Sequence, residues 1–139
     1  MRQVALVLII LSLVFVGCAT TTQERLLDSD TSQLQLRSIQ TRAFDTKDKV
    51  KTLRTVIATL QDLDFVIDKA DSTLGIVSAT KLENYFLRIT VTVRPRGETQ
   101  LLVRANAQYN VEPIKDPKLY QQFFTSLEKA MFLTAHDAD

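Results

Sequence analysis

Few side chains in this sequence could do chemistry, and the one in the most informative position is Cys18. It is the only cysteine in the chain, it follows Gly17, and both stand at the end of an apolar run from Val4 to Val16 that Arg2 precedes. A positive start, a short apolar stretch and a small residue at the cut are the features of a cleaved export signal. In bacteria, a cysteine directly after such a cut accepts a diacylglyceryl group through a thioether. We therefore predict cleavage between Gly17 and Cys18, followed by lipidation of Cys18.

The segment from Phe15 to Cys18 resembles the bacterial lipobox, with Phe15 at a place where leucine is more usual. The resemblance implies a signal peptide over residues 1–17 and acyl chains such as palmitate on Cys18. Ala19 follows the cysteine, and the absence of Asp at this position implies sorting to the periplasmic face of the outer membrane. Each buried methylene contributes about 0.8 kcal/mol, so two or three chains would anchor the protein firmly.

This segment has two other interpretations. A retained membrane helix over residues 4–16 would be about 20 Å long, which is short of the ~30 Å hydrocarbon core. Cys18 could instead be a free thiol or half of an intermolecular disulfide. Both are weaker, because the apolar run ends right beside the cysteine.

The other reactive groups do not form a recognisable catalytic or metal site. His136 is the only histidine and is the fourth residue from the carboxyl-terminal end of the sequence, where we expect a disordered tail over residues 136–139. Four acidic residues cluster in sequence, but Val66 and Ile67 stand where a calcium loop starting at the first of them needs Asp or Asn and Gly. These four residues are Asp62, Asp64, Asp68 and Asp71. We expect them to end a helix and flank a turn, and we expect no enzyme activity, metal or cofactor.

The charge balance argues against nucleic acid as a partner. Removal of residues 1–17 takes away Arg2, one of the 17 basic residues, and none of the 16 acidic ones, so the mature chain has no formal net charge. Nucleic-acid-binding proteins usually carry a basic excess. Residues 18–36 are rich in Thr, Gln, Asp and Ser and predict a flexible tether. The following residues, 37–135, are enough for a single domain.

The residue patterns predict an α+β domain. A strand is expected over residues 37–44, and Asp45 or Thr46 can cap a helix with apolar residues from Val50 to Leu63 at three- and four-residue spacings. Two short apolar runs, 65–67 and 76–80, flank a turn and predict a hairpin. Asp116 and Pro117 suit the start of a second helix.

The clearest expected strand pair covers residues 85–94 and 101–111, each with strict alternation of apolar and polar residues. Pro95, Arg96 and Gly97 suit a three-residue loop, which would place Arg94 opposite Glu98 and Arg88 opposite Arg104. The simplest arrangement is an antiparallel sheet of about four to five strands with two helices on one face.

If both helices cover one face, the other face is free and is a candidate surface for partner binding. Four outward residues of the strand pair are its candidate contacts: Phe86, Arg88, Leu102 and Arg104. Opposed arginines repel each other unless an acidic or anionic group lies between them. A solvated face with no partner is the simpler alternative.

The run from Val56 to Ile67, followed by Asp71, Gly75-Ile76-Val77 and Ala79, is similar to the helix-to-hairpin segment of small bacterial envelope lipoproteins, BamC-like proteins among them. BamC-like lipoproteins belong to the outer-membrane barrel-assembly machinery and have helix-grip domains. The resemblance implies a helix-grip fold and a location in the envelope. It carries over no catalytic or binding residue.

These observations favour a lipid-anchored, non-catalytic interaction or accessory module with an envelope protein as partner. The alternative is a periplasmic carrier of a lipid or small apolar ligand. A sheet that grips a helix can leave a groove, here with Tyr85, Tyr109, Phe123 and Phe124 as candidate lining residues.

Overall fold

The computed structural model describes residues 32–82, 86–132 and 135–137. The chain divides into residues 1–33 and a compact unit from Leu34 to Asp139. Residues 32–40 are helical. The labelled elements that follow are, in chain order, β1 (Thr41–Phe44), α3 (Lys49–Asp62), β2 (Val66–Asp71), β3 (Ile76–Leu82), β4 (Phe86–Arg96), β5 (Gln100–Tyr109), β6 (Glu112–Pro113), α4 (Pro117–Met131) and β7 (Ala135–Asp137).

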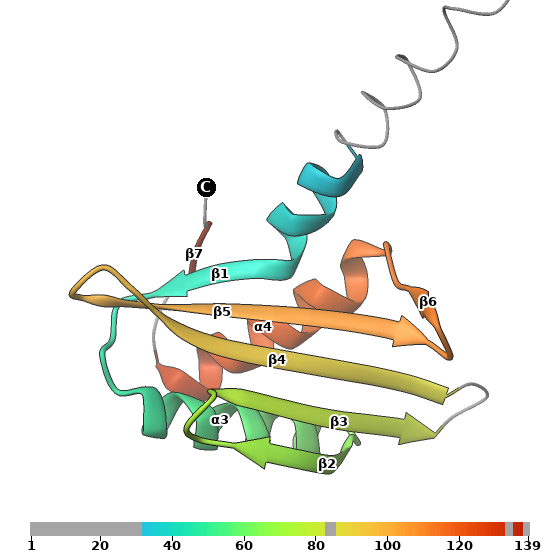
Figure 1. Cartoon of the computed structure of the whole chain (residues 1–139), viewed down its shortest axis with the longest axis horizontal. Helices are drawn as coiled ribbons and strands as arrows, with labels where there is room; N and C mark the ends of the chain where they lie inside the picture. The colour runs from blue at the N-terminus through green and yellow to red at the C-terminus, as the bar shows by residue number, and fades with distance from the viewer. Residues whose placement is uncertain (1–31, 83–85, 133–134, 138–139) are drawn as a thin grey trace, which may run out of the picture. The chain divides into compact units, whose positions relative to one another are not determined.

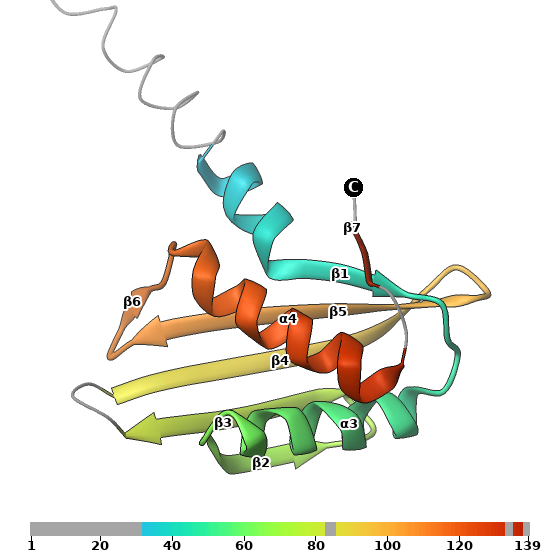
Figure 2. The ribbon, with the colours of Figure 1, turned by 180° about the vertical axis from the view of Figure 1, so that it is seen from behind.

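The strands form one antiparallel sheet in the order β2-β3-β4-β5-β1-β7, and β6 pairs with the end of β5. Helices α3 and α4 lie side by side across one face of this sheet (Figures 1 and 2). The predicted α+β class, with two helices packed on an antiparallel sheet, is confirmed. Among the described residues the sheet has seven strands, more than expected, because the short strands β6 and β7 extend it.

The core lies between the sheet and the two helices. Most inward residues of β4 and β5, from Leu87 to Val93 and from Leu101 to Ala107, are almost fully buried there, which explains their alternation with the residues of the other face. The helices contribute the apolar residues that recur at helical spacing. The largest buried apolar side chains of the core are Phe44, Val56, Leu60, Val77, Ile89, Val91, Val93, Leu101, Tyr120, Phe123 and Leu127.

The helix caps agree with the sequence at α4 and differ at α3. Asp116 caps α4 by accepting a hydrogen bond from the Lys118 N–H (3.0 Å), and Pro117 takes the first helical position. At α3 the cap is Asp48, which accepts from the Lys51 N–H (2.9 Å), and not Asp45 or Thr46 as predicted. Asp45 is used elsewhere, because its carboxylate bonds side chains of β5 and β7.

The hairpin of β2 and β3 is confirmed, and its turn depends on Gly75. This glycine has φ +71°, a conformation that costs other residues free energy. Its carbonyl accepts from the Val93 N–H (2.8 Å), so the turn is tied to β4. The Asp71 carboxylate accepts from the Leu74 N–H (2.9 Å), which is the turn role expected for it.

The predicted register of β4 and β5 is wrong by four positions. β4 continues through Pro95 to Arg96, which pairs with Gln100, and the turn lies at residues 97–99. Proline has no N–H to donate, so it fits a strand only where no neighbouring strand needs that hydrogen bond. The nitrogen of Pro95 is on the same side of β4 as the Val93 N–H, and β3 does not extend far enough to pair with Pro95. A shift by an even number keeps every side chain on its predicted face, since strand side chains alternate with period two.

Both ends of the domain are more ordered than predicted. The helix over residues 32–40 includes residues 32–36 of the expected tether and the beginning of the expected strand 37–44, so β1 starts only at Thr41. Leu36 and Ile39, three residues apart, are half-buried, a spacing that suits a helix. At the other end, β7 includes His136 and Asp137 of the expected disordered tail and pairs with β1.

Candidate functional site

The sheet face opposite α3 and α4 carries the polar residues of β4 and β5, and we call it the open face. Figure 2 shows both helices on the other side. The residues of β4 and β5 on the open face are Phe86, Arg88, Thr90, Thr92, Arg94, Arg96, Gln100, Leu102, Arg104, Asn106 and Gln108. Because four of them are arginines and none is acidic, this central part of the face is cationic.

The four candidate contact residues share the open face but do not form one patch. Arg88 lies opposite Gln108, and Arg104 lies opposite Thr92, so the predicted arginine pair is not formed. Phe86 is eight residues along β4 from the residue that pairs with Leu102, a separation of about 26 Å at the usual rise of a strand.

Phe86 and Arg88 form a separate cluster at the end of β4. The Phe86 side chain is 40% exposed, and the Arg88 guanidinium lies 5.4 Å from the centre of its ring. On the neighbouring strand β3, Leu82 pairs with Phe86, and its side chain is exposed. This end of the open face therefore combines apolar surface with a cation.

Arg94 and Arg104 are brought together by the actual register, and they flank a hollow. They are diagonal neighbours on β4 and β5, a relationship that places the two residues about 7–8 Å apart, with their Cβ atoms somewhat closer. The hollow has a volume of about 490 Å³. Its lining residues are Thr90, Thr92, Arg94, Leu102, Arg104 and Asn106.

The two arginines of the hollow have no carboxylate partner among the described residues. The predicted register paired Arg94 with Glu98, but Glu98 lies in the turn. Arg104 bonds only an amide, as its Nη2 donates to Gln40 Oε1 at 3.4 Å. Sequence reasoning missed Arg94 as a site residue, although its position two residues after Thr92 put it on the same face.

A buried amide supports one wall of the hollow. Gln40 is 2% exposed, and besides Arg104 it contacts Asn106, whose Oδ1 accepts from Gln40 Nε2 at 3.4 Å. The same Nε2 donates to the hydroxyl of Tyr120 on α4 at 3.1 Å. Gln40 thereby connects the helical layer with Arg104 and Asn106 on the open face, a role that its sequence position gave no reason to expect.

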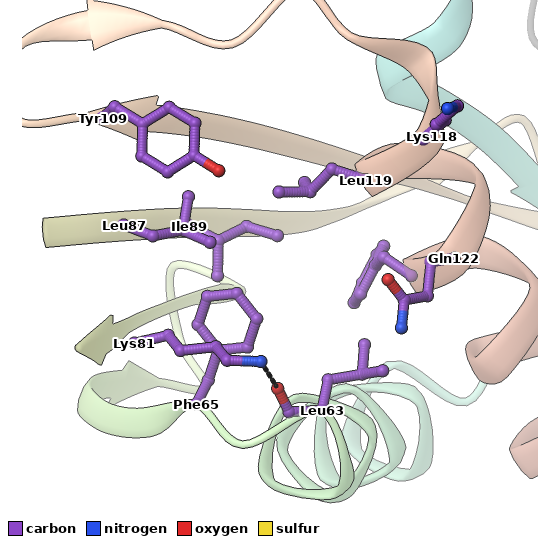
Figure 3. A pocket seen from close by; sticks show the side chains of 10 residues that line it. Leu63, Phe65, Lys81, Leu87, Ile89, Tyr109, Lys118, Leu119 and Gln122 are labelled. Carbon is purple, nitrogen blue, oxygen red and sulfur yellow. Dashed lines mark hydrogen bonds between the residues drawn. The ribbon is translucent and has the colours of Figure 1, made fainter. Parts of the chain in front are cut away.

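A second cavity lies between the sheet and the helices, as shown in Figure 3. Its volume is about 240 Å³. Tyr109 and Phe123, two of the expected groove residues, line it together with Leu63, Phe65, Lys81, Leu87, Ile89, Lys118, Leu119 and Gln122. Phe124 is in the core instead, with the Arg42 guanidinium 5.3 Å from its ring centre, and Tyr85 lies outside the described residues.

Lys81 is the unusual member of this cavity, because it projects from β3 into the helix-facing side. Its Nζ donates to the carbonyl of Leu63 at 3.2 Å (Figure 3) and lies 3.7 Å from Asp64 Oδ2. A cation at the carboxyl end of a helix interacts favourably with the helix dipole. Lys81 therefore stabilises the end of α3.

The acidic cluster is divided among structural contacts. Asp62 is the last residue of α3, Asp64 lies near Lys81, and Asp68 accepts from the Thr80 hydroxyl at 2.6 Å. Asp71 holds the hairpin turn. Within the described ranges, no three His, Cys, Asp or Glu side chains are placed to hold a metal ion.

His136 and Asp45 form an exposed contact at the edge of the sheet. His136 Nε2 lies 2.8 Å from Asp45 Oδ2, and Gln100 Nε2 donates to Asp45 Oδ1 at 2.7 Å. The hydrogen bond from Gln100, followed by that with His136, lowers the pKa of Asp45 below its ordinary value. This contact attaches β7 to the loop after β1.

Gly17 and Cys18, the predicted cleavage and lipidation residues, lie outside the described residues. In the part of the chain that the structure describes, no helix combines the length and apolarity needed to cross a bilayer. No family model matches the chain, and no curated protein is significantly similar to it in sequence.

Proposed function

We propose that this chain is a lipid-anchored envelope lipoprotein that works as a non-catalytic protein-interaction module at the outer membrane. The observation that carries the proposal is the open face, where arginines of β4 and β5 have no carboxylate partner among the residues that the structure describes, on a surface that neither α3 nor α4 covers. The predicted lipidation at Cys18 supplies the location. A membrane anchor confines the domain near other envelope components, so that weak contacts suffice.

The test is recovery of partners with the lipidated full chain from crosslinked, gently solubilised membranes. Because the open face has two separate clusters, two variants are needed. Phe86→Ser with Arg88→Glu changes the end of β4, and Arg94→Glu with Arg104→Glu changes the hollow. Arg54→Glu, on the exposed side of α3, is the matched control for a charge reversal.

We expect an envelope protein that is recovered with the wild type and the control, and recovered less with at least one open-face variant. All the changed side chains except Phe86 are exposed arginines, and surface substitutions usually change stability little. Equal recovery with all four proteins would exclude the open face as the interaction surface.

The cavity between the layers favours carriage of an apolar ligand as a second candidate function. Its volume of about 240 Å³ exceeds the ~150 Å³ of an engineered apolar cavity that binds benzene. Native mass spectrometry of the full chain would test this function. We expect a bound lipid or other apolar molecule in the wild type that Leu119→Trp displaces, and a wild-type mass with no such molecule would contradict it.

A further inference from the structure

The hollow of the open face has the composition of a site for negative charge. Both guanidinium groups that flank it lack an acidic partner within the described residues, and no lining residue is acidic. Arginine presents several N–H donors in a rigid fork that matches a carboxylate. Two such forks, on diagonal neighbours about 7–8 Å apart, can converge on one carboxylate or hold two adjacent ones.

The neutral residues of the hollow fit a peptide. Hydroxyl groups of Thr90 and Thr92 and the amide of Asn106 can both donate and accept hydrogen bonds, as the peptide backbone requires. Leu102 is half-buried and adds a small apolar contact. On each strand the lining residues span about 13 Å, the length of a few residues of an extended chain.

The shape of the site disfavours a membrane surface as the occupant. The phosphates of a bilayer lie in a plane, whereas the space between Arg94 and Arg104 is a hollow in the sheet face. A protruding acidic segment can enter such a hollow. Gln40, buried beneath its wall, holds the Arg104 guanidinium and Asn106 at one side.

We propose that this hollow receives an acidic segment of the partner protein, with an Asp or Glu carboxylate bound between Arg94 and Arg104. The proposal rests on the proposed function and specifies the chemistry of the partner. Arg94 and Arg104 would bind the carboxylate, and Gln40 would act as a positioning residue for Arg104.

A zero-length crosslink tests for the carboxylate directly. The hollow has no lysine among its lining residues, so a carbodiimide cannot join it to a carboxylate. Arg104→Lys keeps the positive charge and introduces one amine, which a carbodiimide joins only to a carboxyl group in contact with it. Arg54→Lys, on the exposed side of α3, is the matched control.

We expect carbodiimide treatment of membranes to join position 104 of the Arg104→Lys full chain to an Asp or Glu of another protein, identified by mass spectrometry. The control position 54, in the Arg54→Lys chain, should give little of this product. A product joined to Glu24, Asp28 or Asp30 of the same chain would mean that its own amino-terminal segment occupies the hollow, and would overturn the proposal. Absence of any product at position 104 would also overturn it.

A binding measurement with defined peptides tests the carboxylate site in the hollow separately from the proposed interaction function. We expect the full chain in neutral detergent to bind a fluorescent peptide of alternating Glu and Ser, and to bind the peptide of Gln and Ser at least about tenfold more weakly. Arg94→Glu and Arg104→Glu should each weaken binding of the Glu peptide by a similar factor, while Arg54→Glu should leave this binding unchanged. Equal binding of both peptides would overturn the carboxylate site even if hollow variants lose partner recovery, which would leave the proposed function standing.

The same variants distinguish phosphate from carboxylate. Inorganic phosphate should compete poorly with the Glu peptide. Vesicles of phosphatidylcholine with phosphatidylglycerol should bind the Arg104→Glu variant and the wild type equally strongly. Vesicle binding that depends on Arg94 and Arg104 would assign the hollow to lipid and overturn the proposal. Conversely, a peptide site that depends on both arginines, together with equal partner recovery for the wild type, the control and both open-face variants, would support carboxylate binding in the hollow and exclude the open face as the partner surface.

Discussion

Gln40 Nε2 donates a hydrogen bond to the hydroxyl of Tyr120 at 3.1 Å, and both side chains are almost completely buried. The same hydroxyl donates to the carbonyl of Ile114 at 2.8 Å and accepts from the Ala107 N–H at 3.3 Å. Tyr120 thus uses its one donor and two acceptor positions. This network joins α4 to β5, at a residue beyond the part of β5 that pairs with β1, and to the helix over residues 32–40.

Loss of either partner should destabilise the domain. We expect Tyr120→Phe and Gln40→Leu each to lower the free energy of unfolding by about 1–3 kcal/mol, because each leaves a buried polar group without its partner. The two losses should add incompletely in the double variant, since the residues are in contact. Urea denaturation measures these values. Gln121→Leu, on the exposed side of α4, is the control, and losses no larger than that of the control would contradict the role of the network.

Gly75 and Gly97 make a matched pair for backbone strain. Both have positive φ, +71° and +61°, but a Cβ at Gly75 would lie 2.4 Å from the Val93 carbonyl oxygen, whereas a Cβ at Gly97 would meet nothing within 4 Å. Gly97→Ala should cost about 1–2 kcal/mol for the left-handed backbone alone. Gly75→Ala should lower the free energy of unfolding by about 1–3 kcal/mol more than Gly97→Ala does, because its added methyl group is also crowded by the Val93 carbonyl. Thermal unfolding of the two variants checks the order, and a smaller loss for Gly75→Ala would contradict it.

The pKa of Asp45 should depend on its two hydrogen-bond donors. We expect Gln100→Ala and His136→Ala each to raise this lowered pKa toward its ordinary value, because the Gln100 hydrogen bond is the largest single cause and His136 lowers the pKa by a hydrogen bond and by its charge. Carboxyl NMR titration measures both shifts. Gln121→Ala should leave the Asp45 titration unchanged.

The sign of the linked effect on stability follows from the lowered pKa. A carboxyl group whose pKa is depressed by folding stabilises the domain above its ordinary pKa, and this contribution is lost as the pH falls through the lowered value. The stability difference between wild type and Gln100→Ala should therefore be largest near neutral pH and shrink in acid. A difference that grows on acidification would contradict this account of Asp45.

Cys18→Ser tests the predicted anchor. Serine has no thiol to form the thioether, so we expect an uncleaved precursor or a protein lost from the outer-membrane fraction. Membrane fractionation and the intact mass of the purified protein report the two outcomes. A variant with the same mature mass, apart from the substitution, and the same membrane fraction as the wild type would contradict lipidation at Cys18.

Local patterns in the sequence were sufficient for the elements and their faces. Three- and four-residue spacings identified α3 and α4, and alternation identified β4 and β5, because burial of one side of an element leaves a periodic trace. Asp116 and Pro117 indicated the start of α4 for an equally local reason. The helix over residues 32–40 was missed because the polar composition up to residue 36 predicted a tether, and the residues from 37 onward were assigned to a strand. β7 was missed because three residues carry too little pattern.

The candidate site, in contrast, depended on contacts between distant segments. The sequence by itself determined that Phe86, Arg88, Leu102 and Arg104 share a face, since any even shift of register preserves it. Only the tertiary structure decided that Arg104 neighbours Arg94 rather than Arg88, because the end of β3 lets β4 continue through Pro95 and so moves the turn. It also decided that Gln40 reaches Tyr120 and Arg104, side chains 80 and 64 residues away in sequence, because such a contact exists only after the sheet and helices have packed.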